Sequence, residues 1–105
     1  MAALQTSSVQ PLQSFGEVFV YPNPFIISDG TSSLTIDGLI GNSNIKIFTI
    51  SGKLINDYKS PGGKIAFWDG KDLDGNLVPT GIYIITAYDQ EASNVKTSKV
   101  AVIRK

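Results

Sequence analysis

The sequence predicts an all-β domain, an antiparallel β-sandwich of about seven short strands, and three observations support this fold class. Segments rich in Val, Ile, Phe and Tyr recur at short intervals along the 105 residues. Clusters of Gly, Pro, Asn and Ser separate these segments, as turns require. No stretch of the sequence repeats apolar residues at the spacing of an amphipathic helix. A chain of this length has room for one hydrophobic core, so we expect one domain.

Two strands are expected in the first forty residues. The first covers residues 17–21 and ends at Pro22 and Pro24, because proline has no amide hydrogen to donate to a neighbouring strand. The second lies in SSLTIDGL, which starts at Ser32 and alternates apolar with polar side chains. The run GNSN then provides a turn.

The clearest hairpin signal is the stretch IKIFTISGKLINDYK. Residues 45–50 and 53–58 are expected to form its two arms around Ser51 and Gly52, where glycine can adopt the positive φ of a tight turn. The turn residues SPGG follow, and residues 64–69 are expected to form the next strand.

The last two strands are expected near the C-terminal end. The stretch GIYIITAYD from Gly81 is the longest apolar run, and it predicts a central strand that is buried on both faces. The polar run QEASN separates it from the final strand in VKTSKVAVIRK. In this strand Val100 and Val102 alternate with Ala101 and Ile103.

Two aromatic residues favour a sandwich of the immunoglobulin-like type over a closed barrel. Trp68 lies mid-chain on a predicted strand, where such sandwiches often bury a tryptophan. Gly81 and Tyr83 resemble the start of a tyrosine corner, in which the hydroxyl bonds back to nearby backbone. An ordinary place in the core explains either residue equally well.

Composition argues against several classes of function. Nine basic and nine acidic side chains cancel, so no long-range field attracts nucleic acid or an anionic membrane. The sequence has no cysteine and no histidine, which removes disulfides, thiolate or histidine metal sites and Ser-His-Asp triads. No stretch is long enough to span a membrane, and no signal peptide is recognisable. We therefore expect a protein that is not an enzyme and that uses no cofactor.

The Ser- and Gln-rich residues 1–16 are expected to be a linker or the tail of an upstream domain. The β-sandwich is then expected to cover residues 17–105.

The segment WDGKDLDGNLVPTG raises a metal-binding alternative. Asp69, Asp72 and Asp74, with backbone carbonyls, are weak candidate ligands for a hard cation. An EF-hand loop does not fit, because aligning Gly75 with the sixth position puts glycines at the first and twelfth. A connector between two strands explains the segment better, since Asp, Asn and Gly are turn residues. In this connector Leu73 is expected to fold inward.

Four motifs in order resemble a known family. They are VYPNPF at Val20, IKIFTISGKLI at Ile45, WDGKDLDGNLVPTGIYII at Trp68 and SKVAVIRK at Ser98. Together they resemble the C-terminal sorting domain, type A, of cargo of the bacterial type IX secretion system. A related immunoglobulin-like domain occurs in the flagellar hook-capping protein. The structural signature residues are Trp68, Asp69, Gly70, Asp74, Gly75, Gly81 and Tyr83.

The resemblance implies a β-sandwich at the C-terminus of a larger bacterial protein that is exported through the periplasm to the outer membrane or cell surface. In ordinary cargo a sortase removes the domain and attaches the cargo to lipopolysaccharide. A narrower match in LTIDGL, GGKIAFWDG and VPTGIY resembles the C-terminal domain of the propeller-containing subunit of the attachment complex, where the domain is retained. The expected partners are therefore proteins of the secretion and attachment machinery, with the sortase among them. The sequence leaves open whether the domain is cargo or machinery.

Partner recognition is expected at the C-terminal strand, because an exposed edge strand offers unpaired amide and carbonyl groups. Its basic side chains would meet an acidic partner or, alternatively, would only solubilise the edge. Two other functions stay open: a purely structural spacer, and a module that binds a cation or a carbohydrate through the aspartate-rich segment. The candidate recognition residues are Lys99, Val100, Ala101, Val102, Ile103, Arg104, Lys105, Tyr21, Pro22, Asn23 and Pro24.

Overall fold

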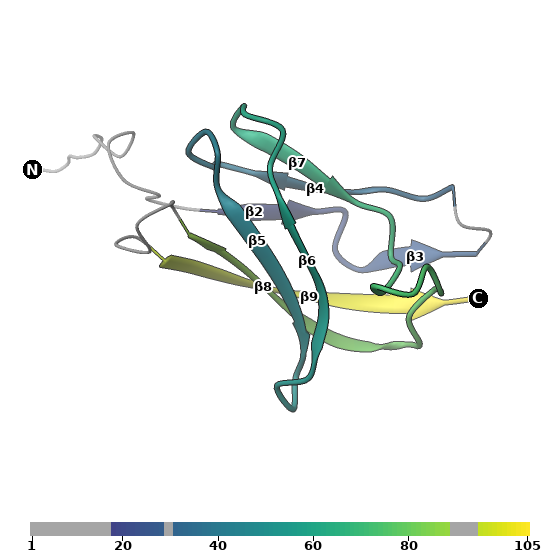
Figure 1. Cartoon of the computed structure of the whole chain (residues 1–105). Helices are drawn as coiled ribbons and strands as arrows, with labels where there is room; N and C mark the ends of the chain where they lie inside the picture. The colour runs from purple at the N-terminus through teal and green to yellow at the C-terminus, as the bar shows by residue number, and fades with distance from the viewer. Residues whose placement is uncertain (1–17, 29–30, 89–94) are drawn as a thin grey trace, which may run out of the picture.

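The computed structural model describes residues 18–28, 31–88 and 95–105. Over these residues it contains eight strands and no helix, and hence no helix long and apolar enough to cross a membrane (Figure 1). The prediction of an all-β domain is confirmed. The strands are β2 (Phe19–Tyr21), β3 (Phe25–Ile27), β4 (Leu34–Asp37), β5 (Asn44–Thr49), β6 (Leu54–Lys59), β7 (Ile65–Trp68), β8 (Gly81–Tyr88) and β9 (Val95–Arg104).

The strands form two sheets packed as a sandwich (Figure 1). The smaller sheet has the order β2-β4-β7, and both of its pairs are antiparallel. The larger sheet has the order β3-β9-β8-β5-β6, in which β3 runs parallel to β9 and the other pairs are antiparallel. The predicted sandwich is therefore confirmed, with eight strands in the described part where about seven were expected.

The hydrophobic core lies between the two sheets. It is built from every second residue of each strand, because successive side chains of a strand point to opposite faces. In the smaller sheet Leu34 and Ile36 of β4 are fully buried, as their alternation with polar residues predicts. In the larger sheet Ile45, Ile47 and Ile85 are fully buried opposite them.

Strand β8 is central, as predicted, but it is not buried on both faces. Tyr83 and Ile85 point into the core, whereas Ile82 on the other face is 43% exposed. In the structure no second layer covers the outer face of the larger sheet over the described residues (Figure 1). The apolar run GIYIITAYD therefore contributes both to the core and to an exposed face.

Strand β3 is not among the strands that the sequence predicts. The first strand is expected to end at Tyr21, before Pro22 and Pro24, and β2 does end at Tyr21. Directly after it, Phe25 and Ile27 enter the core of the sandwich with exposures of 1% and 0%. The same stretch of chain thus supplies one strand to each sheet, β2 to the smaller and β3 to the larger.

An aromatic cluster joins the two sheets. The ring of Trp68 on β7 lies 6.0 Å from the ring of Phe25 on β3 and 5.8 Å from that of Tyr83 on β8, measured between centroids. The Trp68 indole Nε1 donates a hydrogen bond to the carbonyl of Lys71 at 2.9 Å. The Tyr83 hydroxyl donates to the carbonyl of Pro79 at 2.6 Å, which is the bond of a tyrosine corner. Both aromatic predictions are confirmed.

The predicted hairpin consists of β5 and β6. Its turn closes with hydrogen bonds from the Thr49 amide to the Lys53 carbonyl and from the Gly52 amide to the Thr49 carbonyl, at 2.8 and 2.9 Å. Gly52 has a φ of 99°, the positive value expected there. The register shifts next to Phe48, which leaves Phe48 opposite Leu54.

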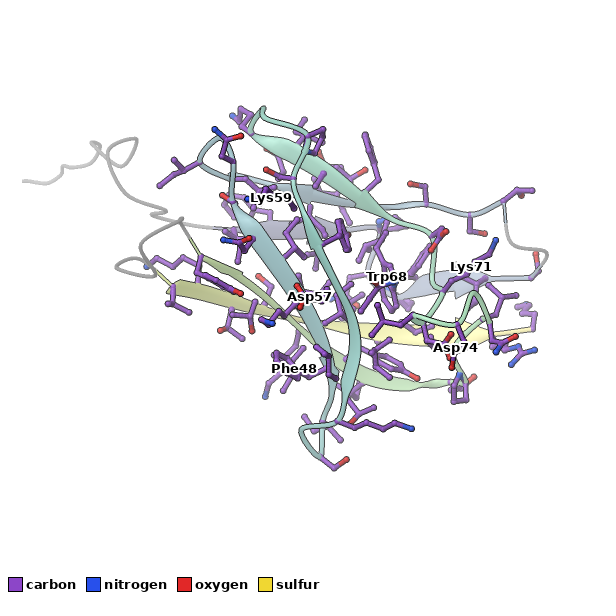
Figure 2. All side chains as sticks on the ribbon, in the orientation of Figure 1. Phe48, Asp57, Lys59, Trp68, Lys71 and Asp74 are labelled. Carbon is purple, nitrogen blue, oxygen red and sulfur yellow. The ribbon has the colours of Figure 1, made fainter. Side chains whose placement is uncertain are left out.

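The aspartate-rich segment is a connector whose side chains mostly bond to its own backbone. Asp72 Oδ1 accepts hydrogen bonds from the amides of Asp74 and Asn76, and Asp69 Oδ1 accepts one from the amide of Lys71. Figure 2 shows Asp74 in this connector, at the end of the sandwich where the C-terminus lies. In the part of the chain that the structure describes, no three acidic side chains gather closely enough to hold a metal ion.

The same connector attaches to the edge of β6. The Leu73 amide donates to the Ile55 carbonyl at 3.0 Å, and the Asn56 side chain donates to the Lys71 carbonyl at 2.9 Å. The Leu73 side chain itself is 61% exposed, so the expectation that it folds inward is wrong. Its backbone is held by β6 instead, and this leaves the side chain on the outside.

Gly70 and Gly75 differ in what surrounds them. Both have positive φ, 81° and 86°. A Cβ atom at position 70 would lie 3.1 Å from Cγ2 of Ile27 and 3.4 Å from the ring of Phe25, whereas position 75 has nothing within 4 Å. The backbone of Gly70 therefore packs directly on the core side of β3.

We predict that Gly70→Ala destabilises the fold more than Gly75→Ala. Each substitution strains a left-handed backbone, at a cost of about 1 kcal/mol. Only Gly70→Ala also overpacks the core, which adds about 1–3 kcal/mol. Urea unfolding of the two variants measures the difference, and equal losses of stability would contradict the close packing of Gly70 on β3.

We also predict that Tyr83→Phe lowers the free energy of unfolding by about 1 kcal/mol, because the carbonyl of Pro79 loses its donor. Tyr21→Phe is the matched control. It removes a hydrogen bond to Asp37 on the exposed surface, where water replaces the partner, and a smaller loss is expected. Thermal and urea unfolding compare the two. A Tyr83→Phe variant as stable as the wild type would show that the tyrosine corner contributes nothing.

Candidate recognition site at the C-terminal strand

Strand β9 is not a simple edge strand. On one side it pairs with β8 from Val95 to Val102. On the other side Val102, Ile103 and Arg104 pair with β3. The expectation of an exposed edge is therefore wrong for these last residues, because the chain forms a further strand after Pro24 and this strand covers them.

The side chain of Asn23 covers the next part of the same edge. Its Oδ1 accepts a hydrogen bond from the amide of Ala101 at 3.1 Å, and its Nδ2 donates to the carbonyl of Lys99 at 3.4 Å. One amide side chain thus satisfies a backbone donor and a backbone acceptor, as a neighbouring strand would. Asn23 itself is exposed and lies between Pro22 and Pro24, each of which follows a cis peptide bond.

The structure thereby joins the two segments that the sequence marks as candidates. Asn23 is separated along the chain by 76 residues from Lys99 and by 78 from Ala101, yet it contacts both. The sequence places these residues in two separate motifs and contains no signal for their contact. The interaction depends on the path of the chain from the smaller sheet to the larger one.

The candidate residues of β9 divide into two sets. Val100 and Val102 are buried in the core, with exposures of 0% and 1%, so they hold the strand and offer nothing to a partner. The side chains between and beyond them, from Lys99, Ala101 and Ile103, lie on the outer face of the sheet. Among the described residues Lys99 has no ion-pair partner.

The last two residues, which are basic, form hydrogen bonds to neighbouring segments. Arg104 donates from its amide to Oγ1 of Thr80 at 2.9 Å and from its guanidinium to the carbonyl of Leu77 at 3.2 Å. The Lys105 amide donates to the carbonyl of Ile27 at 2.9 Å. Both side chains remain exposed, so the terminus presents fixed positive charge at this end of the sandwich.

Tyr21 lies on β2 in the smaller sheet. Its ring is 45% exposed, and its hydroxyl donates to Oδ2 of Asp37 at 2.9 Å. A tyrosine hydroxyl is protonated at neutral pH at its ordinary pKa, and this hydrogen bond raises the pKa of Tyr21 further. Tyr21 is therefore a neutral aromatic side chain at the start of the segment that leads to Asn23.

We predict that Asn23→Ala speeds hydrogen exchange of the Ala101 amide by about fivefold or more, because a lost hydrogen bond of about 1 kcal/mol raises the open population by that factor. Asn23→Asp is the matched control, since it keeps the acceptor for this amide and removes only the donor to Lys99. Exchange followed by NMR gives both values. An Ala101 amide that is equally protected in Asn23→Ala would rule out the side-chain cover of β9.

Comparison with known proteins places the chain in a family. The model of the family described as secretion system C-terminal sorting domain matches residues 19–103. A comparison with curated proteins found no match. The matched residues include every described strand except the last residue of β9.

Two solved structures are similar to the chain. The first is PorZ, described as an essential bacterial surface component of the type IX secretion system of Porphyromonas gingivalis. It is 33% identical, with a TM-score of 0.68, over 83% of this chain and 11% of that chain. The second, CopC from Methylosinus trichosporium OB3b, is 13% identical over 84% of this chain and 95% of that chain, and its TM-score of 0.46 supports no functional comparison.

The family match and the likeness to PorZ agree with the four ordered motifs of the sequence, from VYPNPF to SKVAVIRK. They also agree with the described sandwich. VYPNPF runs from β2 to the start of β3, and IKIFTISGKLI runs from β5 to the start of β6. The third motif runs from the end of β7 through the connector into β8, and SKVAVIRK covers the end of β9. The resemblance stated from the sequence is therefore confirmed: the chain belongs to the family of secretion system C-terminal sorting domains.

Proposed function

We propose that type IX secretion and attachment proteins recognise this domain at the surface where the segment 21–24 meets β9. As a member of the sorting-domain family, the chain directs export by the type IX system to the outer membrane or cell surface. The observation that supports recognition at this surface is the contact of Asn23 with Lys99 and Ala101, which joins two candidate segments.

The chemistry of this surface suits the binding of a protein. Lys99 provides positive charge where Asn23 contacts β9, Pro22 and Pro24 are exposed on either side of Asn23, and Lys105 adds positive charge just beyond the end of the strand. Complementary charge increases the rate at which two proteins meet and fixes their orientation. An acidic surface on the secretion or attachment machinery is the partner that these residues fit, and the domain itself contributes no chemical step.

A specific observation favours a second form of this function, in which the domain is retained as a docking domain. PorZ, to which the chain is 33% identical, is a surface component of the secretion system. This chain spans about a tenth of PorZ, so the likeness concerns the domain alone. In the cargo form the sortase releases the domain from the exported protein, whereas in the retained form the domain stays attached.

The function is tested by fusing the 105-residue chain to the C-terminus of a reporter with a signal peptide, in a bacterium that has a type IX system. We predict that the wild-type fusion reaches the cell surface. Surface reporter is expected to fall with the double substitution Lys99→Glu and Lys105→Glu, because the charge that meets an acidic partner is reversed. The matched control reverses Lys53 and Lys59, two exposed lysines elsewhere in the domain.

Surface labelling and blots for the domain separate the outcomes. A wild-type fusion that stays in the periplasm would contradict the sorting function of this chain. Equal delivery of the two double variants, both of them folded, would show that recognition does not depend on Lys99 and Lys105. Reporter released from the domain indicates processing by the sortase, whereas intact fusion at the surface indicates the retained form.

A further inference from the structure

We propose that the apolar half of the outer face of the five-stranded sheet is the docking surface for a protein of the export or attachment machinery whose contact area is apolar at its centre and acidic at its rim. The inference rests on the proposed function and specifies the kind of partner. We call this surface the apolar half-face. It consists of Ile26, Phe48, Leu54, Ile82, Ile84, Ala101 and Ile103.

The register of the strands brings these side chains together. Ile84 on β8 lies opposite Phe48 on β5, and Phe48 lies opposite Leu54 on β6. One step along the same face, Ile82 lies opposite Ala101 on β9. Ile103 and Ile26 form the next pair, between β9 and β3. The apolar half-face therefore crosses all five strands without a gap in the pairing.

The exposure of these side chains is unusual for apolar residues on one contiguous surface. Ile26 is 46% exposed, Ile82 43%, and Leu54 and Ile103 37% each. Single exposed apolar residues are common on soluble proteins, but contiguous groups mark sites of interaction. The described part of the chain contains no element that covers this face (Figure 1).

The middle of the same face is polar, and it separates the apolar half-face from Tyr88 and Val95 at the far end. Two residues beyond Ile84, Thr86 on β8 lies between Thr97 and Lys46 on its neighbours. Lys46 forms an ion pair with Asp57 of β6 at 2.8 Å. In Figure 2 Lys59, Asp57 and Phe48 follow one another along the β5–β6 hairpin toward the apolar half-face.

The charge beside the apolar half-face determines which charge the rim of the partner should carry. On the strands of the larger sheet the one acidic side chain, Asp57, is already paired with Lys46. Lys99 lies directly beside Ile84 at the border of the apolar half-face and has no ion-pair partner among the described residues. A partner with carboxylates at its rim would meet this charge.

The same charges argue against two other occupants. A second copy of the chain, packed face to face, offers Lys99 no free carboxylate from this sheet, because Asp57 is already paired with Lys46, and a charge buried without a partner costs stability. An anionic lipid surface is attracted by clusters of roughly four to eight basic side chains. Within the apolar half-face and its border the described residues provide Lys99 alone, so a protein fits better than a membrane.

Binding to outer-membrane vesicles tests the proposal. The labelled 105-residue chain is mixed with vesicles purified from a bacterium that has a type IX system, with the same vesicles after protease treatment, and with protein-free vesicles made from their lipids. We predict binding to the untreated vesicles only. Ile82→Gln should bind at least about tenfold more weakly, because an apolar contact is lost. Thr86→Gln, four residues along the same strand and face, should bind as the wild type does.

A second arm tests the acidic rim. Lys99→Glu should weaken binding to the untreated vesicles, and rising salt should weaken binding of the wild type. Thermal unfolding confirms that each variant is folded, and sedimentation at the binding concentration reports self-association.

Several results would overturn the proposal. They are equal binding of Ile82→Gln and the wild type, undiminished binding to protein-free vesicles, self-association that Ile82→Gln abolishes, and no binding to any vesicle. The reporter fusion separates these failures from a failure of the proposed function. If the wild-type reporter reaches the surface while any of these results is obtained, the docking surface is wrong and the sorting function stands. If the wild-type reporter is not exported, the sorting function fails regardless of the vesicle results.

Discussion

The contact of Trp68 with Phe25 and Tyr83 is the interaction on which the rest of the structure depends. The three rings come from different strands, and Trp68 belongs to the smaller sheet while its two partners belong to the larger one. The cluster therefore fixes the distance between the sheets and also the place of β3. Because β3 covers the end of β9, the path of the C-terminal strand depends on the same packing.

The core also determines which residues the protein presents to a partner. Strand residues alternate between faces, so burying Val100 and Val102 forces Lys99, Ala101 and Ile103 outward. A shift of one residue in the register of β9 would place a lysine in the core and valines in solvent, which the packing forbids. The packing of the core therefore determines which side chains lie on the outer face of the sheet.

Most strands could be predicted from the sequence because their signals are local. The alternation around Leu34, the turn at Gly52 and the apolar run from Gly81 each lie within a few residues of the element that they predict. The aromatic predictions at Trp68 and Tyr83 succeeded for a related reason, since the hydrogen bonds of both residues run to backbone only three and four residues away.

The missed features depend on contacts between distant parts of the chain. Strand β3 has three residues, and its partner β9 lies some 77 residues later, as in the pair of Phe25 with Val102. No local pattern specifies that pairing. The cover of β9 by Asn23 likewise requires that the chain cross from one sheet to the other first. The expectation that Leu73 folds inward rests on its hydrophobicity, and it is wrong because a backbone hydrogen bond to Ile55 leaves the side chain on the outside.

These long-range contacts change how the domain can be recognised. Recognition by an added strand needs free amide and carbonyl groups. Between Lys99 and Arg104, however, the backbone groups on the edge of β9 are hydrogen-bonded to Asn23 or paired with β3. The backbone there is occupied, while the side chains of Lys99, Ala101 and Ile103 remain on an open face beside Ile82 and Ile26. Closing the edge of β9 protects the domain from unwanted strand pairing, and it moves recognition from the backbone of the last strand to the side chains of the sheet.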